Sequence, residues 1–440
     1  MKIPEKPQDW KEVLDKEGEK AFKFIRENKL FQKVIDCNKK YYYWEELKYR
    51  VDSPEEQKYL WALMKFLRSE KYEPVQLSSL ELKYVALPEI NKQLHQFDKY
   101  STGNIEIQSR TLGLEKKYIL SSLMEEAIAS SILEGAATTR KAAKIMLKEN
   151  RKPKTKDELM IVNGFETMQM IGKRRKDKLS PEFLLDIQRL ITKGTLKRED
   201  DAGKFRDNDE IIVGDQQNAE LIYHIPPTHH KINQFMNELC DFANDDSQFI
   251  HPIIKGSILH FMIGYIHPFN DGNGRAARSV FYWYVLSRGY WLFEYMALSR
   301  RILRSRKDYG LAYLYTESDE MDLTYFLRYI LTSIEDTLKD LLDYIQIKQE
   351  EIQEAKILLN KVKEINFRQA NVLGEMISNP GKILTIEEIS RTYNVVYQTA
   401  RNDLLFLAKK GYLTKSKISR KYVFRFTGEN QEQLKSLNNF

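Results

Sequence analysis

The sequence has little of what a secreted or membrane-spanning protein needs. Among 440 residues there are two cysteines, Cys37 and Cys240, which cannot form a disulfide framework and lack the spacing of a zinc site. The first ten residues lack the apolar core of a signal peptide, and apolar runs such as 258–266 are far shorter than the ~18 residues of a membrane helix. These absences predict a cytoplasmic protein with no membrane partner.

The charge balance and the aromatic content exclude a disordered chain. The chain has 70 Lys and Arg against 63 Asp and Glu, a net charge of +7, and 12% aromatic residues, which is too many for a disordered chain. At roughly 100–200 residues per domain, the length allows two to four domains. So small a basic excess indicates a negatively charged partner only if it is concentrated in one part of the chain.

Changes of pattern along the chain predict five parts. Ser53 and Pro54 begin a helix near the N-terminus, one hairpin is expected between Arg206 and Pro227, and apolar residues from Leu327 onward recur at helical spacing with a polar break at Lys348. That long helix either packs on the core or forms the seam of a homodimer. The predicted parts are a helical unit (1–78), a central domain (79–355), a linker helix (356–370), a winged helix-turn-helix (371–428) and a polar tail (429–440).

One segment combines residue types that suit work on phosphates. Residues 267–278 read HPFNDGNGRAAR and lie between two apolar stretches with helical spacing. The backbone N–H groups of Gly272, Asn273 and Gly274 fall at the start of the second predicted helix, where unpaired N–H groups and the helix dipole attract anions. Arg275 and Arg278 share one face of that helix. The segment therefore predicts a polyphosphate site.

The same segment holds a carboxylate and an imidazole. Asp271 could hold a hard cation such as Mg²⁺, and His267 has the pKa range of a general base. The sequence lacks a P-loop, and the calcium-loop and dinucleotide patterns fit poorly. The alternative is that His267 only caps a helix and the glycines only turn the chain. The number of constrained positions favours the functional interpretation.

These residues resemble the signature of the Fic family, HxF[x][D/E]GNGRxxR, at every specified position. The segments 251–267 and 203–227 also resemble the helix before that loop and the hairpin flap, so the resemblance is expected to cover residues 80–350. It implies a mainly α fold, a Fic-type helical bundle with a β-hairpin flap, ahead of the predicted winged helix. It also implies transfer of AMP from ATP to a Tyr, Ser or Thr hydroxyl of a target protein or of the chain itself.

The resemblance assigns roles to the residues of the loop. His267 would deprotonate the target hydroxyl, and Asp271 would bind Mg²⁺ on the α- and β-phosphates of ATP. The N–H groups of 272–274 would hold phosphate oxygens, with Arg275 and Arg278 on the outer phosphates. Phe269 is expected to be a core anchor. For adenine the family often has paired tyrosines, whereas this chain has Tyr309 followed by Gly310, so Tyr309 is the candidate.

A second motif lies upstream. Residues 129–135, ASSILEG, fit the family's inhibitory pattern [S/T]xxxE[G/N], which places Ser130 and Glu134 on one face of a helix. The resemblance implies that Glu134 pairs with Arg278 and occupies the place of the γ-phosphate. The same carboxylate could instead orient water for removal of AMP, and a solvated helix face is the structural alternative.

The predicted flap and the C-terminal part are the segments expected to bind other macromolecules. Ile211, Ile212 and Val213, opposite residues 221–223, would form a ribbon whose edge docks the target, and Arg206 would tie its base to the loop. Residues 381–426 hold ten basic against three acidic residues, a local +7 equal to that of the whole chain. Within 385–426 a basic winged helix could contact DNA or dock a protein. The second hypothesis is therefore a DNA-binding regulator whose Fic-like domain senses a nucleotide, and another nucleotide donor than ATP also stays open.

Overall fold

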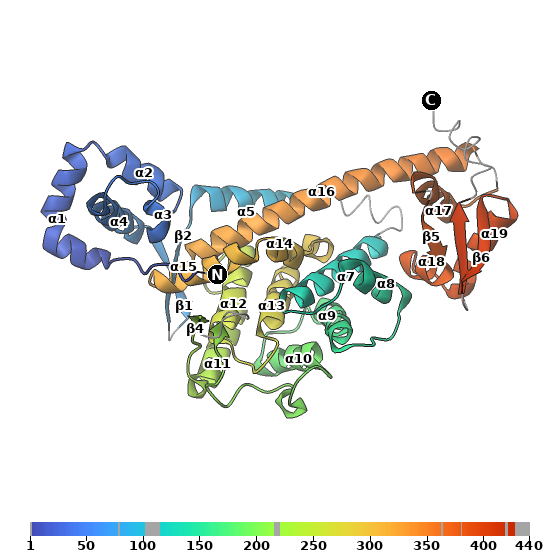
Figure 1. Ribbon diagram of the computed structural model, residues 1–440, viewed down its shortest axis with the longest axis horizontal. Helices are drawn as coiled ribbons and strands as arrows, with labels where there is room; N and C mark the ends of the chain where they lie inside the picture. The colour runs from blue at the N-terminus through green and yellow to red at the C-terminus, as the bar shows by residue number, and fades with distance from the viewer. Residues whose placement is uncertain are drawn as a thin grey trace.

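The structure is a computed structural model, and it describes residues 2–77, 80–101, 115–214, 221–361, 364–379, 381–418 and 421–426 (Figure 1). Side chains are described for most of these residues, but not for 101, 115–118, 348–349, 351–361 and 378. The predicted tail 429–440 lies outside these ranges. The mainly helical fold predicted from the sequence is confirmed.

The N-terminal part is a group of helices followed by a hairpin. Its elements are α1 (Trp10–Glu27), α2 (Phe31–Lys39), α3 (Trp44–Leu47), α4 (Pro54–Ser69), β1 (Tyr72–Leu77) and β2 (Leu80–Val85). As expected, α4 begins at Pro54, where the Ser53 hydroxyl accepts a hydrogen bond from Glu56 N at 3.1 Å. The sequence did not predict the β1–β2 hairpin, and the predicted boundary at residue 78 falls at its turn.

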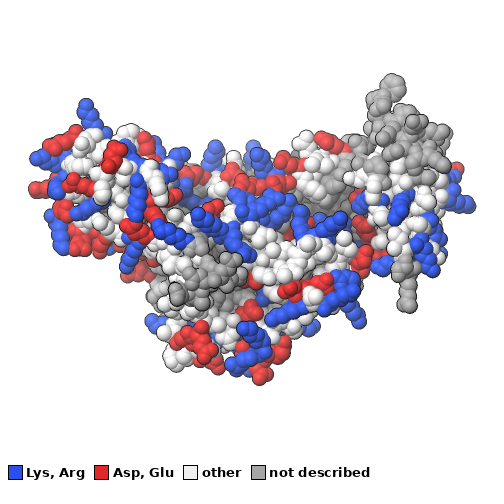
Figure 2. Space-filling model, in the orientation of Figure 1, with Lys and Arg blue, Asp and Glu red and all other residues white. Residues whose placement is uncertain are grey.

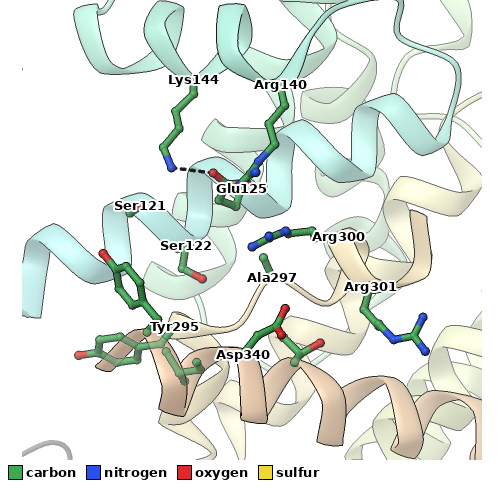
Figure 3. Close-up of a pocket in the computed structure, with 13 residues that line it drawn as sticks. Ser121, Ser122, Glu125, Arg140, Lys144, Tyr295, Ala297, Arg300, Arg301 and Asp340 are labelled. Atoms are coloured by element: carbon green, nitrogen blue, oxygen red, sulfur yellow. Dashed lines mark hydrogen bonds and ion pairs between the residues drawn. The ribbon is translucent and has the colours of Figure 1, made fainter. Parts of the chain in front are cut away.

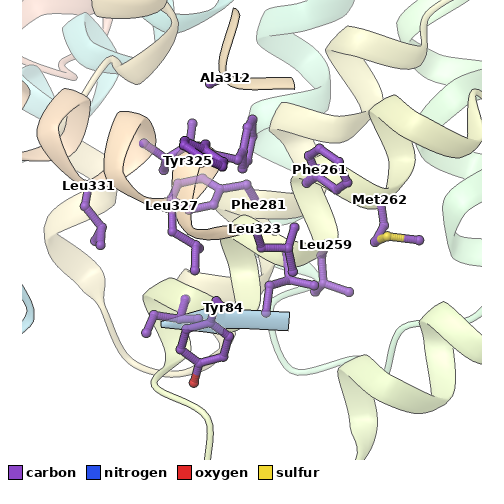
Figure 4. Packing of buried hydrophobic residues seen from close by; sticks show 14 of the residues in the cluster. Tyr84, Leu259, Phe261, Met262, Phe281, Ala312, Leu323, Tyr325, Leu327 and Leu331 are labelled. Carbon is purple, nitrogen blue, oxygen red and sulfur yellow. The ribbon is translucent and has the colours of Figure 1, made fainter. Parts of the chain in front are cut away.

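The central part surrounds two adjacent helices, α12 (Pro252–Ile266) and α13 (Asn273–Ser287). Both helices are buried on nearly all sides, which explains why α12 is apolar on most of its faces, while α13 also carries the buried Arg275 and Arg278. Leu259 and Phe261 of α12 and Phe281 of α13 pack with residues at the start of α16 (Figure 4). The surrounding elements are α5 (Pro88–Ser101), α7 (Glu115–Leu133), α8 (Arg140–Glu149), α9 (Lys156–Lys173), α10 (Pro181–Thr192), η1 (Glu199–Asp201), β3 (Val213–Gly214), β4 (Ile222–His224), η2 (His229–Lys231), α11 (Ile232–Asn244), η3 (Trp291–Tyr295), α14 (Leu298–Arg304), α15 (Arg306–Ser318) and α16 (Thr324–Lys361).

The longest helix, α16, differs in part from its prediction. It runs from Thr324 to Lys361 without interruption, so the polar break expected at Lys348 is absent from its backbone. Leu331, Ile334 and Leu341 are buried in the central core, as expected for a helix packed on the core rather than for a dimer seam. The side chain of Ile352, which belonged to the same predicted pattern, lies outside the described side chains.

The C-terminal part has its own core. Its elements are α17 (Phe367–Ser378), β5 (Ile383–Thr385), α18 (Ile386–Thr392), α19 (Tyr397–Lys409), β6 (Leu413–Ile418) and β7 (Lys421–Phe426), with strand order β5-β7-β6. Because α16 ends at Lys361 and α17 begins at Phe367, the predicted linker helix 356–370 contains parts of two helices. The C-terminal part also touches α8, where Lys148 pairs with Glu388 at 3.2 Å and Glu149 with Lys421 at 3.2 Å.

A buried polar network joins the N-terminal helices to the turn before α16. Lys65 Nζ lies 2.8 Å from Asp319 Oδ1, and both side chains are almost fully buried. Arg68 Nη1 donates to Tyr325 at 2.8 Å, while the Tyr41 hydroxyl donates to Asp322 at 2.6 Å. Among the described helices, none is long and apolar enough to cross a membrane.

The Asp319→Asn substitution is expected to lower the free energy of unfolding by about 3–5 kcal/mol, because it leaves the buried Lys65 ammonium without its counter-ion. Urea unfolding of the full chain measures the change. As a control, Glu12→Gln removes the exposed pair with Lys16, and a change below about 1 kcal/mol is expected there. Equal small effects in both variants would contradict the importance of the buried pair.

Candidate active site

The loop between α12 and α13 is held in shape by its own residues. His267 ends α12 with φ of 51°, and Gly272 precedes α13 with φ of +89°, so the chain turns sharply at both ends. The Asn273 side chain closes the loop: its Oδ1 accepts from Phe269 N at 2.9 Å, and its Nδ2 donates to Phe269 O at 2.7 Å. Phe269 is buried and stacks on Phe205, in the anchor position expected of it.

The surroundings of His267 suit a base. Its Nδ1 lies 2.9 Å from Gly264 O, and since a carbonyl only accepts, Nδ1 carries the proton and Nε2 keeps a free lone pair. Burial lowers the pKa of His267 below its ordinary value, more strongly than the Gly264 hydrogen bond and the nearby Glu134 carboxylate raise it. The ring is therefore neutral at pH 7.

Arg206 connects the segment before the flap to this loop. Its backbone N donates to Pro268 O at 2.9 Å, its Nε donates to His267 O at 2.9 Å, and its Nη2 donates to Pro227 O. The guanidinium is buried and also pairs with Asp209. One side chain thus ties both ends of the hairpin segment to the backbone of His267.

The flap itself is shorter than the sequence predicted. Only Val213 and Gly214 form β3, with Val213 opposite His224 and a register shift before Gly214. Ile211 and Ile212 lie outside the strand, and Ile212 is exposed. The predicted polar turn at 215–220 lies outside the described residues.

The sequence analysis missed the residue that fixes β4. His224 Nε2 lies 2.7 Å from Tyr265 O on α12, and its Nδ1 lies 2.7 Å from Glu317 on α15. Since a carbonyl only accepts, Nε2 donates this hydrogen bond, and the flap strand is bonded to the last turn of the helix that carries His267. No local signal marks this histidine, because both partners are more than 40 residues away.

Asp271 and Arg275 form a pair at the mouth of the loop. Arg275 Nη2 lies 3.2 Å from Asp271 Oδ1, and Arg275 Nη1 donates to Ile191 O at 2.9 Å. The Arg275 side chain is buried, and burial lowers its pKa despite the Asp271 carboxylate, while the Asp271 side chain is about half exposed. Gln188, which the sequence did not single out, donates from Nε2 to Asp271 O at 3.3 Å.

Arg278 joins α13 to the end of α7. Its Nε donates to Ser130 Oγ at 2.9 Å, and its Nη2 donates to Glu134 Oε1 at 2.9 Å and to Ser130 O at 3.2 Å. Burial acts to raise the pKa of Glu134, but Arg278 and Arg275 outweigh it, so the carboxyl pKa lies below its usual range and the group is ionised. Ser130, Glu134 and Arg278, predicted from two separate motifs, are thus in direct contact.

The Glu134 carboxylate also covers the start of α13. A methyl group built at Gly274 would collide with Glu134 Oε1, so the carboxylate lies directly over the first turn of this helix. Arg306, another residue that the sequence analysis missed, donates to Leu133 O at 2.5 Å and so fixes the backbone just before Glu134. An anion approaching the helix N-terminus meets this carboxylate first.

Tyr309 lies close to the same arginine but is already engaged. Its hydroxyl lies 2.9 Å from His260 Nε2, and burial raises its pKa to about 12 although Arg278 acts in the opposite direction. Burial lowers the pKa of His260 to about 3, so this histidine is neutral. The structure therefore brings Tyr309 to the edge of the site, with its hydroxyl directed to α12.

Part of the chain is similar in sequence to known proteins. Residues 178–285 match the sequence model of the Fic/DOC family. The protein adenylyltransferase Fic of Nematostella vectensis is 24% identical over 216 residues, which are 47% of this chain and 48% of that protein. The protein of the same name from Drosophila melanogaster is 25% identical over 190 residues, 43% of this chain and 34% of the relative. The chain thus spans about half the length, or less, of the curated relatives it matches.

Two solved structures share the fold. A Fic family protein from Desulfovibrio desulfuricans G20 has a TM-score of 0.50 at 19% identity, covering 78% of this chain and 98% of that one. Fic-1 (residues 134–508) from C. elegans has a TM-score of 0.50 at 17% identity, covering 74% and 88%. The chain therefore shares its fold with these Fic family proteins, and residues 178–285 match the Fic/DOC sequence model, in line with the predicted resemblance. The matched segment 178–285 is shorter than the predicted 80–350 and excludes Ser130, Glu134 and Tyr309.

Proposed function

We propose that the chain is a protein adenylyltransferase that moves AMP from ATP to a hydroxyl group of a protein and is restrained by Glu134. The observation that carries the proposal is a neutral imidazole, with a free Nε2, beside a helix N-terminus and two buried guanidinium groups. The Fic domain and the adenylyltransferase names of the relatives support the same reaction.

The chemistry follows from these positions. His267 Nε2 takes the proton of the target hydroxyl, while the hydroxyl oxygen forms a bond to the α-phosphorus of ATP. The bond from the α-phosphorus to the bridging oxygen breaks, and pyrophosphate leaves. The N–H groups of 272–274, with Arg275 and Arg278, hold the phosphate oxygens and stabilise their charge. The fixed shape of the loop means that little of it has to reorganise during the reaction.

Mg²⁺ is part of the proposal through Asp271. Among the described residues, no group of three or more His, Cys, Asp and Glu side chains could enclose a metal ion. Mg²⁺ commonly takes only one or two protein carboxylates and completes its shell with phosphates and water. The half-exposed carboxylate of Asp271, at the mouth of an anion-binding loop, fits such a site, where the ion would neutralise phosphate charge.

Glu134 acts as the restraint for an electrostatic reason. With Glu134 in place, its charge and that of Asp271 balance the charges of Arg275 and Arg278. A polyphosphate would meet a carboxylate over Gly274 and an arginine fork that is already occupied. Removing the carboxylate frees the fork and leaves a net positive charge at the start of α13.

The Glu134→Gly substitution is expected to increase ATP-dependent self-labelling about 10- to 100-fold, because a hydrogen bond to a charged group contributes about 1.5–3 kcal/mol. Labelling with radioactive ATP, followed by mass spectrometry, measures it. Glu134→Asp is the matched control: it keeps the charge but shortens the reach to Arg278. His267→Ala should abolish labelling in every background, and labelling that persists would refute the role of His267.

Activity should fall at acidic pH, with a midpoint below pH 6.5. His267 must be neutral to accept a proton, and burial holds its pKa below the ordinary value of 6.5. A pH profile of initial labelling rates locates the midpoint. Because Glu134 raises the pKa of His267, the midpoint in Glu134→Gln should lie lower than in the unmodified protein. A midpoint above 6.5 would assign the base to another group.

DNA binding by the C-terminal part is the second candidate function, and a specific observation favours it. Val396 and Tyr397, at the start of α19, are exposed, whereas contacts with α8 come from α18 and β7. The N-terminal half of a recognition helix is thus open (Figure 1). Against it, Lys382, Lys410 and Lys421 are engaged in ion pairs with glutamates, which reduces the charge available for phosphates.

Binding to a 30-base-pair DNA should weaken steeply between 50 and 200 mM salt, and Arg401→Ala should weaken it further, if α19 contacts phosphates. Fluorescence anisotropy of the full chain measures both effects. The control is Lys6→Ala, which removes the same charge at the opposite end of the chain. No binding at 50 mM salt would leave this part as a protein-docking unit.

A further inference from the structure

A cavity with several charged side chains in its lining lies along α7, on the N-terminal side of Ser130. It has a volume of about 190 Å³ and lies between α7, α8, the segment from η3 to α14, and α16 (Figure 3). Its walls carry four basic side chains and only two carboxylates. The basic residues are Arg140, Lys144, Arg300 and Arg301, and the acidic residues are Glu125 and Asp340. The lining therefore has an excess of two positive charges.

Two of the cations share one carboxylate. Arg140 Nε lies 2.5 Å from Glu125 Oε2, and Lys144 Nζ lies 2.7 Å from Glu125 Oε1. Burial acts to raise the pKa of Glu125, but these two partners outweigh it, so the carboxyl is ionised. One negative charge thus faces two positive charges on this wall, and one positive charge is left over.

Arg300 is on the opposite wall. Within the described ranges, its guanidinium makes no hydrogen bond and no ion pair. Burial, Arg140 and Arg304 lower its pKa more strongly than the Glu125 and Asp340 carboxylates raise it, which means that the surroundings disfavour its charge. Figure 3 shows the guanidinium reaching into the space toward Ser122 and Glu125. A bound anion would supply the missing counter-charge.

The walls are held in place by a buried carboxylate behind them. Glu126, adjacent to Glu125 on α7, accepts from Ser299 N at 2.9 Å and from the Tyr282 hydroxyl at 2.9 Å. Ser299 immediately precedes Arg300, so α14 is fixed against α7. The helix segments that carry Glu125 and Arg300 are therefore held together before any ligand arrives, which reduces the entropy lost on binding.

The size of the cavity limits the ligand. Its volume is below the ~300–1,000 Å³ of pockets that hold cofactors and drug-sized molecules. Planar guanidinium forks match oxyanions, and Ser121 and Ser122 add hydroxyl groups. A small tetrahedral oxyanion or its condensed dimer fits, whereas a nucleotide does not.

We propose that this cavity is a second anion site, separate from the loop at 267–278, that binds inorganic phosphate or pyrophosphate. The ligand joins α8 and α14 across α7 through Arg140, Lys144 and Arg300. Glu125 precedes Ser130 by five residues, or about 7.5 Å along the helix. Binding therefore stiffens the helix whose end carries Ser130 and leads to Glu134.

Crystals of the full chain soaked in sodium tungstate test the location, because tungstate is a tetrahedral oxyanion with strong anomalous scattering. An anomalous peak between Arg140, Lys144 and Arg300 is expected, in addition to any peak at the loop. A peak at the loop only, or no peak, would overturn the proposal.

Calorimetric titration with inorganic pyrophosphate tests the site in solution. Arg300→Ala should weaken one binding component at least tenfold. Lys141→Ala, an exposed position on α8 with the same change of charge, should leave it within about twofold, because Lys141 is not part of the lining. Arg300→Lys keeps the charge and should show an intermediate affinity. Equal affinities in Arg300→Ala and Lys141→Ala would contradict the proposal, and thermal unfolding checks that each variant is folded.

Discussion

Arg278 carries its positive charge in an almost fully buried position, and a charge so placed must have a counter-ion. In this structure Glu134 is the counter-ion, while Arg278 Nε donates a hydrogen bond to the Ser130 hydroxyl. The contact ties α7 to α13 across the site. In the proposed function, a polyphosphate would have to take the place of Glu134 in order to pair with Arg278. The proposed restraint and the proposed recognition of substrate thus depend on the same guanidinium group.

The loop at 267–278 does not depend on that contact for its shape. Asn273 bonds to both backbone groups of Phe269, and Arg206 bonds to the carbonyl groups of His267 and Pro268. These bonds leave the N–H groups at the start of α13 in place whether or not Glu134 is present. In the proposed function, release of the carboxylate would thus expose an anion site that is already formed rather than one that has to be assembled.

The sequence was most informative where the physical signal is local. The loop could be predicted because twelve consecutive residues contain its glycines, its base and its arginines, and the start of α4 because Ser53 and Pro54 are adjacent. The link between Ser130, Glu134 and Arg278 came only from the family resemblance, since almost 150 residues separate the partners. His224, Gln188 and Arg306 act through backbone groups far away in sequence, and no spacing rule marks such residues.

The β1–β2 hairpin and the short flap show a second limit. Pro74 within β1 disfavours a strand in the interior of a sheet, but this two-stranded sheet has only edges, where proline is tolerated. In the flap the three apolar residues 211–213 suggested a short two-stranded ribbon, whereas pairing begins only at Val213 and shifts in register before Gly214. Strand content alone could not fix the register in either hairpin.

The uninterrupted length of α16 has a mechanical consequence. Its 38 residues span about 57 Å, and its first half is buried in the core that holds α12 and α13. A tilt of a few degrees at that root would displace the far end by several ångströms, enough to break the contacts of Lys148 and Glu149 with Glu388 and Lys421. Through this helix, small rearrangements near α12 and α13 would become large displacements of the C-terminal part, in the manner of a lever.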